Sequence, residues 1–398
     1  MKKPIIRSLL SRRSRLVFAS TIVTLALAAC PANKTRRNSN VPPLTIGAIL
    51  PLTGALSYYG ESERMGLQLA VEQINGREDG SPRVNLVFED SVGNPATAVT
   101  GAKRLTDIEG AHFFITSLTG VTLAVQPIVA KEKNIIFALT MSASAAKRDS
   151  NVFRIYPGIE EEGEAMTEFV LKRNPSSVAI ISLRQQSIEE QVERIIVPRL
   201  SSAGIHIVAR ESFDRVEQEA RDIVAKISGI APEMIVLNAY YNHLPILLEE
   251  IRKYPALQKC LLVSGLNLAV ALELDPSKAS LFDGAICAVP ASTINLSSSD
   301  ESSANERHFA ETFRSKFQRA PNYDAAYAYD CLMILHPLVS RFGHDIPKIQ
   351  QALRTSDFSA MTVNSFKIDE NGNARSVWRL GKVTNGRIAP YDSPSVVP

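Results

Sequence analysis

Short apolar runs alternate along the chain with segments whose apolar residues recur at helical spacing. The run Leu44–Leu50 ends at Pro51 and predicts a buried strand, and Leu67, Ala70 and Ile74 then predict an amphipathic helix over about 60–75. The further elements expected in this first stretch are strands at 84–89, 113–116 and 135–139 and helices at 96–105 and 121–132. Alternation with short connections predicts right-handed crossovers and a parallel sheet covered on both faces.

The same alternation begins again after Pro157. The second set of expected strands lies at 178–182, 205–209, 234–237, 261–264 and 285–289, with helices around 166–170, 188–196, 217–228 and 244–253. The pattern therefore predicts an α/β protein with two doubly wound units.

The C-terminal part has a different pattern. Three helical segments near 304–317, 323–341 and 346–355 follow one another without intervening strands, which suggests that the chain returns to cover the first unit. Two β-like runs, 362–368 and 377–383, end the pattern, and the turn-forming residues Asp369–Asn373 separate them.

The N-terminus has the pattern of a bacterial secretory signal. Six basic residues and no acid lie in residues 1–29, and an apolar stretch at 16–27 ends in Leu27-Ala28-Ala29-Cys30. This stretch is shorter than the roughly 20 apolar residues of a membrane span. Leu-Ala-Ala-Cys resembles the lipobox of bacterial lipoproteins, which implies cleavage after residue 29 and a lipid on Cys30. Ordinary cleavage near Ala29 is the alternative.

The segment 30–43 is polar and contains several prolines, so we expect it to be a tether between the lipid and the folded body. The whole chain has 44 basic and 41 acidic residues, and removal of residues 1–29 leaves 38 and 41, a net charge of −3. The basic character therefore belongs to the signal, and no electrostatic case for nucleic acid as a partner remains.

Sequence signatures of catalysis are absent. No two glycines are two residues apart, and the P-loop, H-E-x-x-H, C-x-x-C and G-x-S-x-G patterns do not occur. The six histidines are scattered without metal-ligand spacing. We therefore expect that the chain is not an enzyme and has neither cofactor nor metal, and a catalytic triad that assembles only in three dimensions stays open.

Several ordered segments resemble one family, the leucine/isoleucine/valine-binding proteins that serve branched-chain amino acid ABC importers. They lie within 44–385 and are listed here: Gly47–Gly54, Gly60, Gly66–Asn75, Glu89–Val99, Thr119–Val125, Phe153-Arg154 and Pro321–Asp330. The resemblance implies the type I periplasmic binding protein fold, in which two α/β lobes joined by three crossovers close on a small ligand. It places lobe one at 44–156 plus 291–360 and lobe two at 157–290 plus 361–390, with crossovers near 156–158, 289–291 and 360–363.

Candidate ligand-binding residues follow from strand ends and from the resemblance. In open α/β sheets, ligands sit outside the carboxyl ends of strands, where the N-termini of helices present free N–H groups. Thr119, Gly120 and Val121 follow one such strand and Ser142, Ala143 and Ser144 follow the next, and the resemblance assigns both to a ligand carboxylate. Helix capping alone would also explain these hydroxyl residues. Tyr59, Tyr240 and Tyr241 match aromatic residues of the family's cleft, with plain packing as the alternative.

Two departures from the family pattern concern the ligand. Its amino acid binders have an acid after the strand equivalent to 261–264, whereas this chain has Ser264-Gly-Leu-Asn267, with Asn267 as the candidate polar contact. The family's tyrosine after 178–182 is replaced by Arg184–Ser187. A carboxylate-bearing ligand is expected, and an amino acid, another acid and an amide all stay open.

The expected partners are therefore a small ligand, an ABC permease and the membrane, at the periplasmic or extracellular face of a bacterial envelope. An envelope lipoprotein with a degenerate cleft, acting through protein partners, and a ligand sensor are the alternatives.

Overall fold

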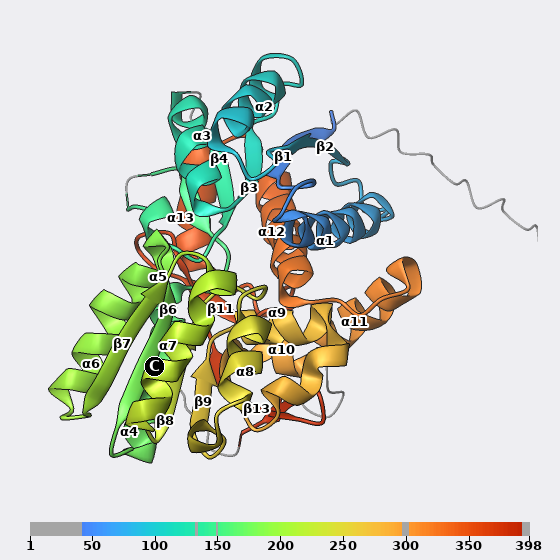
Figure 1. The fold of residues 1–398 in the computed structure, drawn as a ribbon. Coiled ribbons are helices and arrows are strands. Elements are labelled where there is room, and N and C mark those ends of the chain that lie inside the picture. The colour runs from blue at the N-terminus through green and yellow to red at the C-terminus, as the bar shows by residue number, and fades with distance from the viewer. Residues whose placement is uncertain (1–41, 132–133, 149, 297–301, 392–398) are drawn as a thin grey trace, which may run out of the picture. The chain divides into compact units, whose positions relative to one another are not determined.

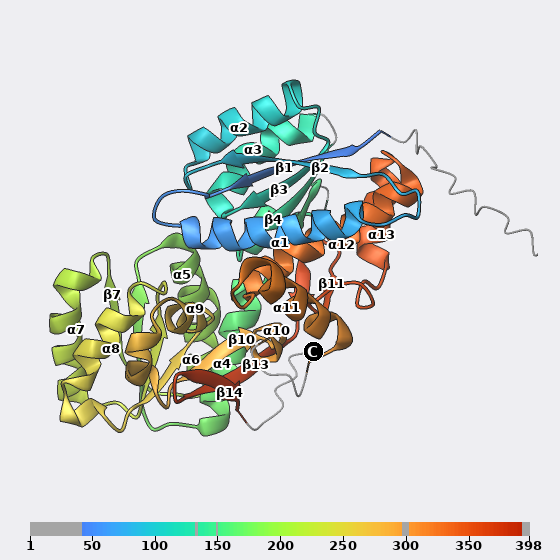
Figure 2. The same cartoon turned by 90° about the vertical axis from the view of Figure 1, so that its right-hand side faces the viewer.

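The computed structural model describes residues 42–391 except 132–133, 149 and 297–301. The expected signal peptide, Cys30 and nearly all of the tether lie outside these residues. The described chain contains two mainly parallel sheets, each with helices on both faces, as Figures 1 and 2 show. This is the α/β architecture with two doubly wound lobes that the pattern predicts.

The first sheet has five parallel strands in the order β2-β1-β3-β4-β5. Its elements are β1 (Leu44–Leu50), α1 (Ser57–Asn75), β2 (Val84–Asp90), α2 (Pro95–Asp107), β3 (Phe113–Ser117), α3 (Thr119–Lys131), β4 (Ile135–Leu139), a 3₁₀ turn (Ala143–Ala145) and β5 (Val152–Arg154). The apolar side chains of β1 alternate between its two faces, as strand geometry requires. Ile46 and Ala48 face the cluster of α1 and α12, while Ile49 faces α2 and α3.

The second sheet has seven strands in the order β14-β13-β10-β9-β8-β6-β7. Five of them are parallel, and β13 and β14 run antiparallel along the edge beside β10. The elements of this part are α4 (Ile159–Arg173), β6 (Val178–Leu183), α5 (Gln186–Gln191), a π-helical turn (Val192–Ile196), α6 (Val197–Ser202), β7 (Ile207–Phe213), α7 (Val216–Ile230), β8 (Met234–Asn238), α8 (Leu244–Arg252), β9 (Leu261–Ser264), α9 (Asn267–Leu274), a 3₁₀ segment (Pro276–Phe282) and β10 (Ile286–Pro290).

The C-terminal helices return to the first sheet. The remaining elements are α10 (Ala291–Asn295), α11 (Ala304–Phe317), α12 (Tyr323–Phe342), α13 (Ile346–Thr355), β11 (Phe366–Ile368), β12 (Ala374–Ser376), β13 (Trp378–Thr384) and β14 (Arg387–Pro390). Helix α12 lies along α1, and the two pass so closely that a Cβ on Gly66 would lie 2.0 Å from the carbonyl oxygen of Ala325. The first sheet is therefore covered on this face by segments about 260 positions apart in the sequence.

The chain passes between the two sheets three times, and buried polar contacts hold these passages together. Arg154, at the end of β5, is fully buried; it donates to the carbonyl oxygen of Tyr156 at 2.8 Å and to Asn373 at 2.8 Å. The carboxylate of Asp330 accepts the backbone N–H groups of Val363 and Asn364 at 2.7 and 2.9 Å. Buried charges bonded in this way fix the path of the connecting segments.

In the described part of the chain, no helix combines the length and the apolar character that crossing a membrane requires.

Candidate functional site

A cavity of about 390 Å³ lies between the carboxyl ends of the strands of the two sheets. Its volume is within the range of about 300–1,000 Å³ that is usual for small-molecule sites. From the first sheet it is lined by residues after β3 and β4, and from the second by residues after β6, β8 and β9. The lining residues are Leu56, Tyr59, Glu63, Gly93, Ser117, Leu118, Thr119, Gly120, Leu123, Leu139, Thr140, Met141, Ser142, Ser144, Tyr156, Gln185, Gln186, Ser187, Glu190, Tyr240, Leu266, Asn267 and Tyr323.

The connection from β3 to α3 carries hydroxyl groups and the N-terminus of a helix. Thr119 is the first residue of α3, and its hydroxyl group lies 2.5 Å from that of Thr140 after β4. Between Ser117 and Thr119, Leu118 has a φ of 71°, in the left-handed region that favours glycine. This strained backbone turns residues 117–120 toward the cavity, where the first N–H groups of α3 have no partner within the helix.

The connection after β4 adds a second group of hydroxyls. Ser142 caps a 3₁₀ turn, accepting from the backbone N–H of Ser144 at 3.3 Å, and the hydroxyl groups of Ser142 and Ser144 are 2.8 Å apart. Both line the cavity, whereas Ala143 between them does not. The two hydroxyl-bearing connections thus meet at one wall, which has the donors that a carboxylate or amide oxygen needs.

Aromatic residues form the opposite surfaces. Tyr59 donates from its hydroxyl group to Oδ1 of Asn267 at 3.2 Å, and this bond joins α1 to α9. Tyr240 lines the cavity from the end of β8, while Tyr241 does not line it and instead packs against the rings of Tyr58 and Tyr59 at 6.0 and 5.7 Å. Tyrosine rings of this kind bind an apolar body and keep a hydroxyl group for hydrogen bonding.

The predicted site residues therefore divide into two groups. The structure brings Tyr59, Thr119, Gly120, Ser142, Ser144, Tyr240 and Asn267 to one cavity. Val121 lies in the apolar cluster of α2 and α3 and, like Ala143 and Tyr241, does not line the cavity. Cys30 lies outside the described residues.

Acidic groups around the cavity were not among the predicted residues. Glu63 on α1 lines it with an exposed fraction of 1%, and its Oε1 accepts from the hydroxyl of Ser117 at 2.8 Å. Burial raises the pKa of Glu63 well above its ordinary value, and the nearby Asp324 raises it further. The sequence signal for Glu63 is its helical position, four residues before Leu67 on the buried face of α1.

Asp324 lies behind the cavity wall. The hydroxyl of Tyr156 donates to it, and both Tyr156 and Tyr323 line the cavity. Burial raises the pKa of Asp324 to about 8, against the hydrogen bonds from these tyrosines, which lower it. The carboxyl group therefore exchanges its proton close to neutral pH.

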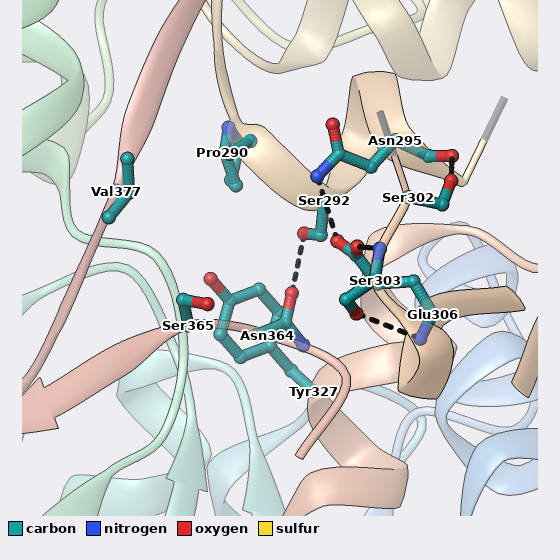
Figure 3. Close-up of a pocket in the computed structure, with 11 residues that line it drawn as sticks. Pro290, Ser292, Asn295, Ser302, Ser303, Glu306, Tyr327, Asn364, Ser365 and Val377 are labelled. Carbon is teal, nitrogen blue, oxygen red and sulfur yellow. Dashed lines mark hydrogen bonds between the residues drawn. The ribbon is translucent and has the colours of Figure 1, made fainter. Parts of the chain in front are cut away.

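A smaller cavity of about 240 Å³ lies among the passages between the sheets (Figure 3). Its polar side chains already bond to one another: Ser292 donates to Asn364 at 2.5 Å, and Asn295 donates to Glu306 at 2.9 Å. Glu306 also completes the capping box of α11 with Ser303. Because these groups hold local structure, the larger cavity is the better candidate for ligand binding. Among the described residues, no group of three or more histidine, cysteine or acidic side chains is arranged to bind a metal.

Comparison with known proteins shows the family. The model of the periplasmic binding protein family matches residues 43–387. A Leucine-, isoleucine-, valine-, threonine-, and alanine-binding protein of Pseudomonas aeruginosa is 19% identical over 333 residues, which cover 82% of this chain and 86% of that protein. A Leu/Ile/Val-binding protein homolog 3 of Brucella melitensis is 25% identical over 205 residues, covering 50% of this chain and 55% of that protein.

Solved structures show the same fold. The leucine-binding protein LivK of Thermotoga maritima has a TM-score of 0.75 at 21% identity, with 87% of this chain and 97% of that chain covered. A solute-binding protein of an ABC transporter from R. palustris, in complex with benzoate, has a TM-score of 0.72 at 18% identity, with 87% and 95% covered. These neighbours have the two-lobed type I fold and are binding proteins, not enzymes. The chain belongs to the periplasmic binding protein family.

Proposed function

We propose that this protein is the solute-binding component of an ABC importer and binds a small carboxylate-bearing ligand between its two lobes. The observation that carries the proposal is the cavity of about 390 Å³, because hydroxyl groups, helix N–H groups and tyrosine rings from both sheets line it together. The ligands in the names of the similar proteins, which are leucine, isoleucine, valine, threonine, alanine and benzoate, support the same class of ligand.

In this proposal the carboxylate binds at one end of the cavity. The donors there are the hydroxyl and N–H groups of Thr119, Gly120, Ser142 and Ser144. The body of the ligand lies against Tyr59, Tyr240 and the apolar side chains of Leu118, Leu123 and Leu266. From the side of the second sheet, further polar groups of the ligand form hydrogen bonds with Gln185, Gln186, Ser187 and Asn267.

Binding is coupled to closure of two lobes, proposed at 44–156 plus 291–360 and at 157–290 plus 361–390. Closure supplies the contacts from the second sheet and presents both lobes to a membrane permease. The proposed location is the periplasmic or extracellular face of a bacterial cell envelope, with export directed by residues 1–29 and a lipid on Cys30 as the membrane anchor.

Thermal unfolding of the full-length protein in mild detergent tests the binding function. The protein is first freed of bound ligand by partial unfolding and dialysis, and is then screened with amino acids, amides, and aliphatic and aromatic carboxylic acids. A ligand at 100 times its Kd adds about 2.7 kcal/mol to the free energy of unfolding and raises the midpoint by several degrees. If no member of the panel shifts the midpoint, the proposal fails, and partners that co-purify with the anchored protein become the next object of study.

A further inference from the structure

Glu63 has an unusual position for a carboxyl group. It lies on α1 with an exposed fraction of 1%, lines the cavity, and is bonded through Oε1 to the hydroxyl of Ser117. Its second oxygen, Oε2, is buried and has no hydrogen-bond partner. A buried acceptor without a partner costs about 1–3 kcal/mol, and more when the group is charged, so a donor is missing from this wall of the cavity.

The charged residues that line the cavity indicate which kind of ligand group could be this donor. Among the described lining residues, Glu63 and Glu190 are the ionisable acids, and lysine, arginine and histidine do not occur. Glu190 already has a cationic partner, since Arg194 lies 2.6 Å from its carboxylate. A ligand with only negative charge would therefore meet two acids and no cation, whereas a ligand that carries a cationic group would find one unpaired carboxyl group.

The groups packed around Glu63 do not supply the missing donor. They are Asp324 and Cys331 on α12, Tyr59 on α1, Ser117 on β3 and Tyr156 on the passage after β5. None of these side chains is a cation, and burial raises the pKa of Asp324 to about 8, which favours its protonated form.

We propose that Glu63 binds the amino group of the ligand and so takes the place of the acid that is missing after β9. The inference rests on the proposed function of the cleft and adds the recognition of an amine from the side of the first sheet. Ser117 links the proposed amine-binding and carboxylate-binding residues. Its hydroxyl group donates to Glu63, and it lies two residues before Thr119 in the sequence. The residues of the first sheet and its helices therefore bind both the amino group and the carboxylate of one ligand, and the residues of the second sheet contact its remaining part.

The arrangement couples binding to the release of a proton. Without ligand, burial raises the pKa of Glu63 well above its ordinary value and so favours the protonated carboxyl group. When an ammonium group binds, the proton of Glu63 passes to the solvent and a buried ion pair forms. Affinity for an amine then rises with pH up to the pKa of the empty site. A carboxylate ligand bound by protonated Glu63 would show the opposite trend.

Titration calorimetry of the full-length protein tests this inference. The probes are the twenty standard amino acids and the carboxylic acids that lack their α-amino groups, each titrated at pH 5.5, 6.5 and 7.5 in buffers of different ionisation enthalpy. We expect binding of amino acids only, with release of a proton and with affinity that rises up to tenfold per pH unit. Glu63→Gln keeps an acceptor for Ser117 and should weaken binding about 100-fold.

Glu61→Gln is the matched control, because Glu61 lies on the same helix but pairs with Arg64 at 2.5 Å outside the cavity. It should leave the affinity unchanged. Equal binding of the deaminated acids, or Glu63→Gln within threefold of the wild type, overturns the role of Glu63 while the binding function stands. If the wild type binds no probe at all, the proposed ligand class falls, and this inference falls with it.

Discussion

The hydroxyl of Tyr59 and the side-chain oxygen of Asn267 are 3.2 Å apart, and this hydrogen bond joins a helix on the first sheet to a helix on the second. The two residues are 208 positions apart in the sequence and both line the cavity. The bond therefore exists only when the two sides of the cavity are close together, so it would stabilise the closed arrangement that we propose for the ligand-bound protein.

Tyr59→Phe removes the hydroxyl group and keeps the ring. We expect ligand affinity to fall about 5- to 10-fold, mainly through faster release, since one hydrogen bond contributes about 1 kcal/mol. Stopped-flow measurement of ligand release checks this. Tyr254→Phe, a partly exposed tyrosine outside the cavity lining, is the control and should release ligand at the wild-type rate. Equal rates for both variants would mean that the Tyr59 bond does not hold the closed form.

Thr119→Val replaces the hydroxyl at the start of α3 with a methyl group. The ligand carboxylate loses one donor and the hydroxyl of Thr140 loses its partner. We expect affinity to fall about 10- to 100-fold, as for a hydrogen bond to a charged group. Equilibrium titration checks the change against Thr106→Val, whose hydroxyl bonds to the carbonyl of Ala102 within α2. An unchanged Kd for Thr119→Val would mean that the ligand carboxylate does not bind at this end of the cavity.

Gly66→Ala tests the contact between α1 and α12. The added Cβ would lie 2.0 Å from the carbonyl oxygen of Ala325, so the helices must move apart, and we expect a loss of about 2–3 kcal/mol in the free energy of unfolding. Chemical denaturation measures it. Gly229→Ala near the end of α7 meets no atom within 4 Å and should stabilise by about 0.5–1 kcal/mol through helix propensity. A neutral result at Gly66 would contradict the close approach.

Asp324→Asn tests the buried acid behind Tyr156 and Tyr323. The pKa of Asp324 is raised from 3.8 to about 8 in the folded protein, so the unfolded chain releases this proton first as pH rises. The contribution of Asp324 to the free energy of unfolding is therefore complete below about pH 4 and is lost as the pH rises from about 4 to 8. We expect the midpoint of the wild type to fall across this range, and that of the variant to fall by roughly 5 °C less.

The unfolding midpoint of the variant should still fall somewhat with pH because of Asp330. Burial raises the pKa of Asp330 to about 7, although the hydrogen bonds from backbone N–H groups lower it. Thermal unfolding of both proteins between pH 5 and 8 makes the comparison. Parallel curves would mean that Asp324 titrates at its ordinary pKa.

The strands and helices were predictable where local pattern decides them. The strands Ile135–Leu139 and Leu261–Ser264 have the predicted bounds, because short apolar runs end there at residues of different character. The expected strand 205–209 lies instead at Ile207–Phe213, since this edge strand is half exposed and has no clear apolar run. Helix α9 was not predicted, because its apolar residues surround it and leave no amphipathic period.

The cavity was predictable in part for a similar reason. Thr119 and Ser142 follow directly from strand ends, which depend only on the local sequence and on the direction of parallel strands. Glu63 depends on packing against α12, whose residues lie about 260 positions further along the chain. The sequence alone shows only that Glu63 is on the same side of the helix as apolar residues, and a glutamate at such a position is usually exposed to solvent.

The pairing of α1 with α12 sets the order in which the protein is completed. Strands β1 to β4 and helix α1 are made first, yet the apolar face that they share is covered only when residues 323–342 leave the ribosome. Strands β6 to β10 of the second sheet pair with one another soon after they are made, and only its edge strands β13 and β14 come later, whereas a whole face of the first sheet waits for α12. Nascent chains should therefore keep the first sheet incomplete until late, with its apolar residues available to chaperones.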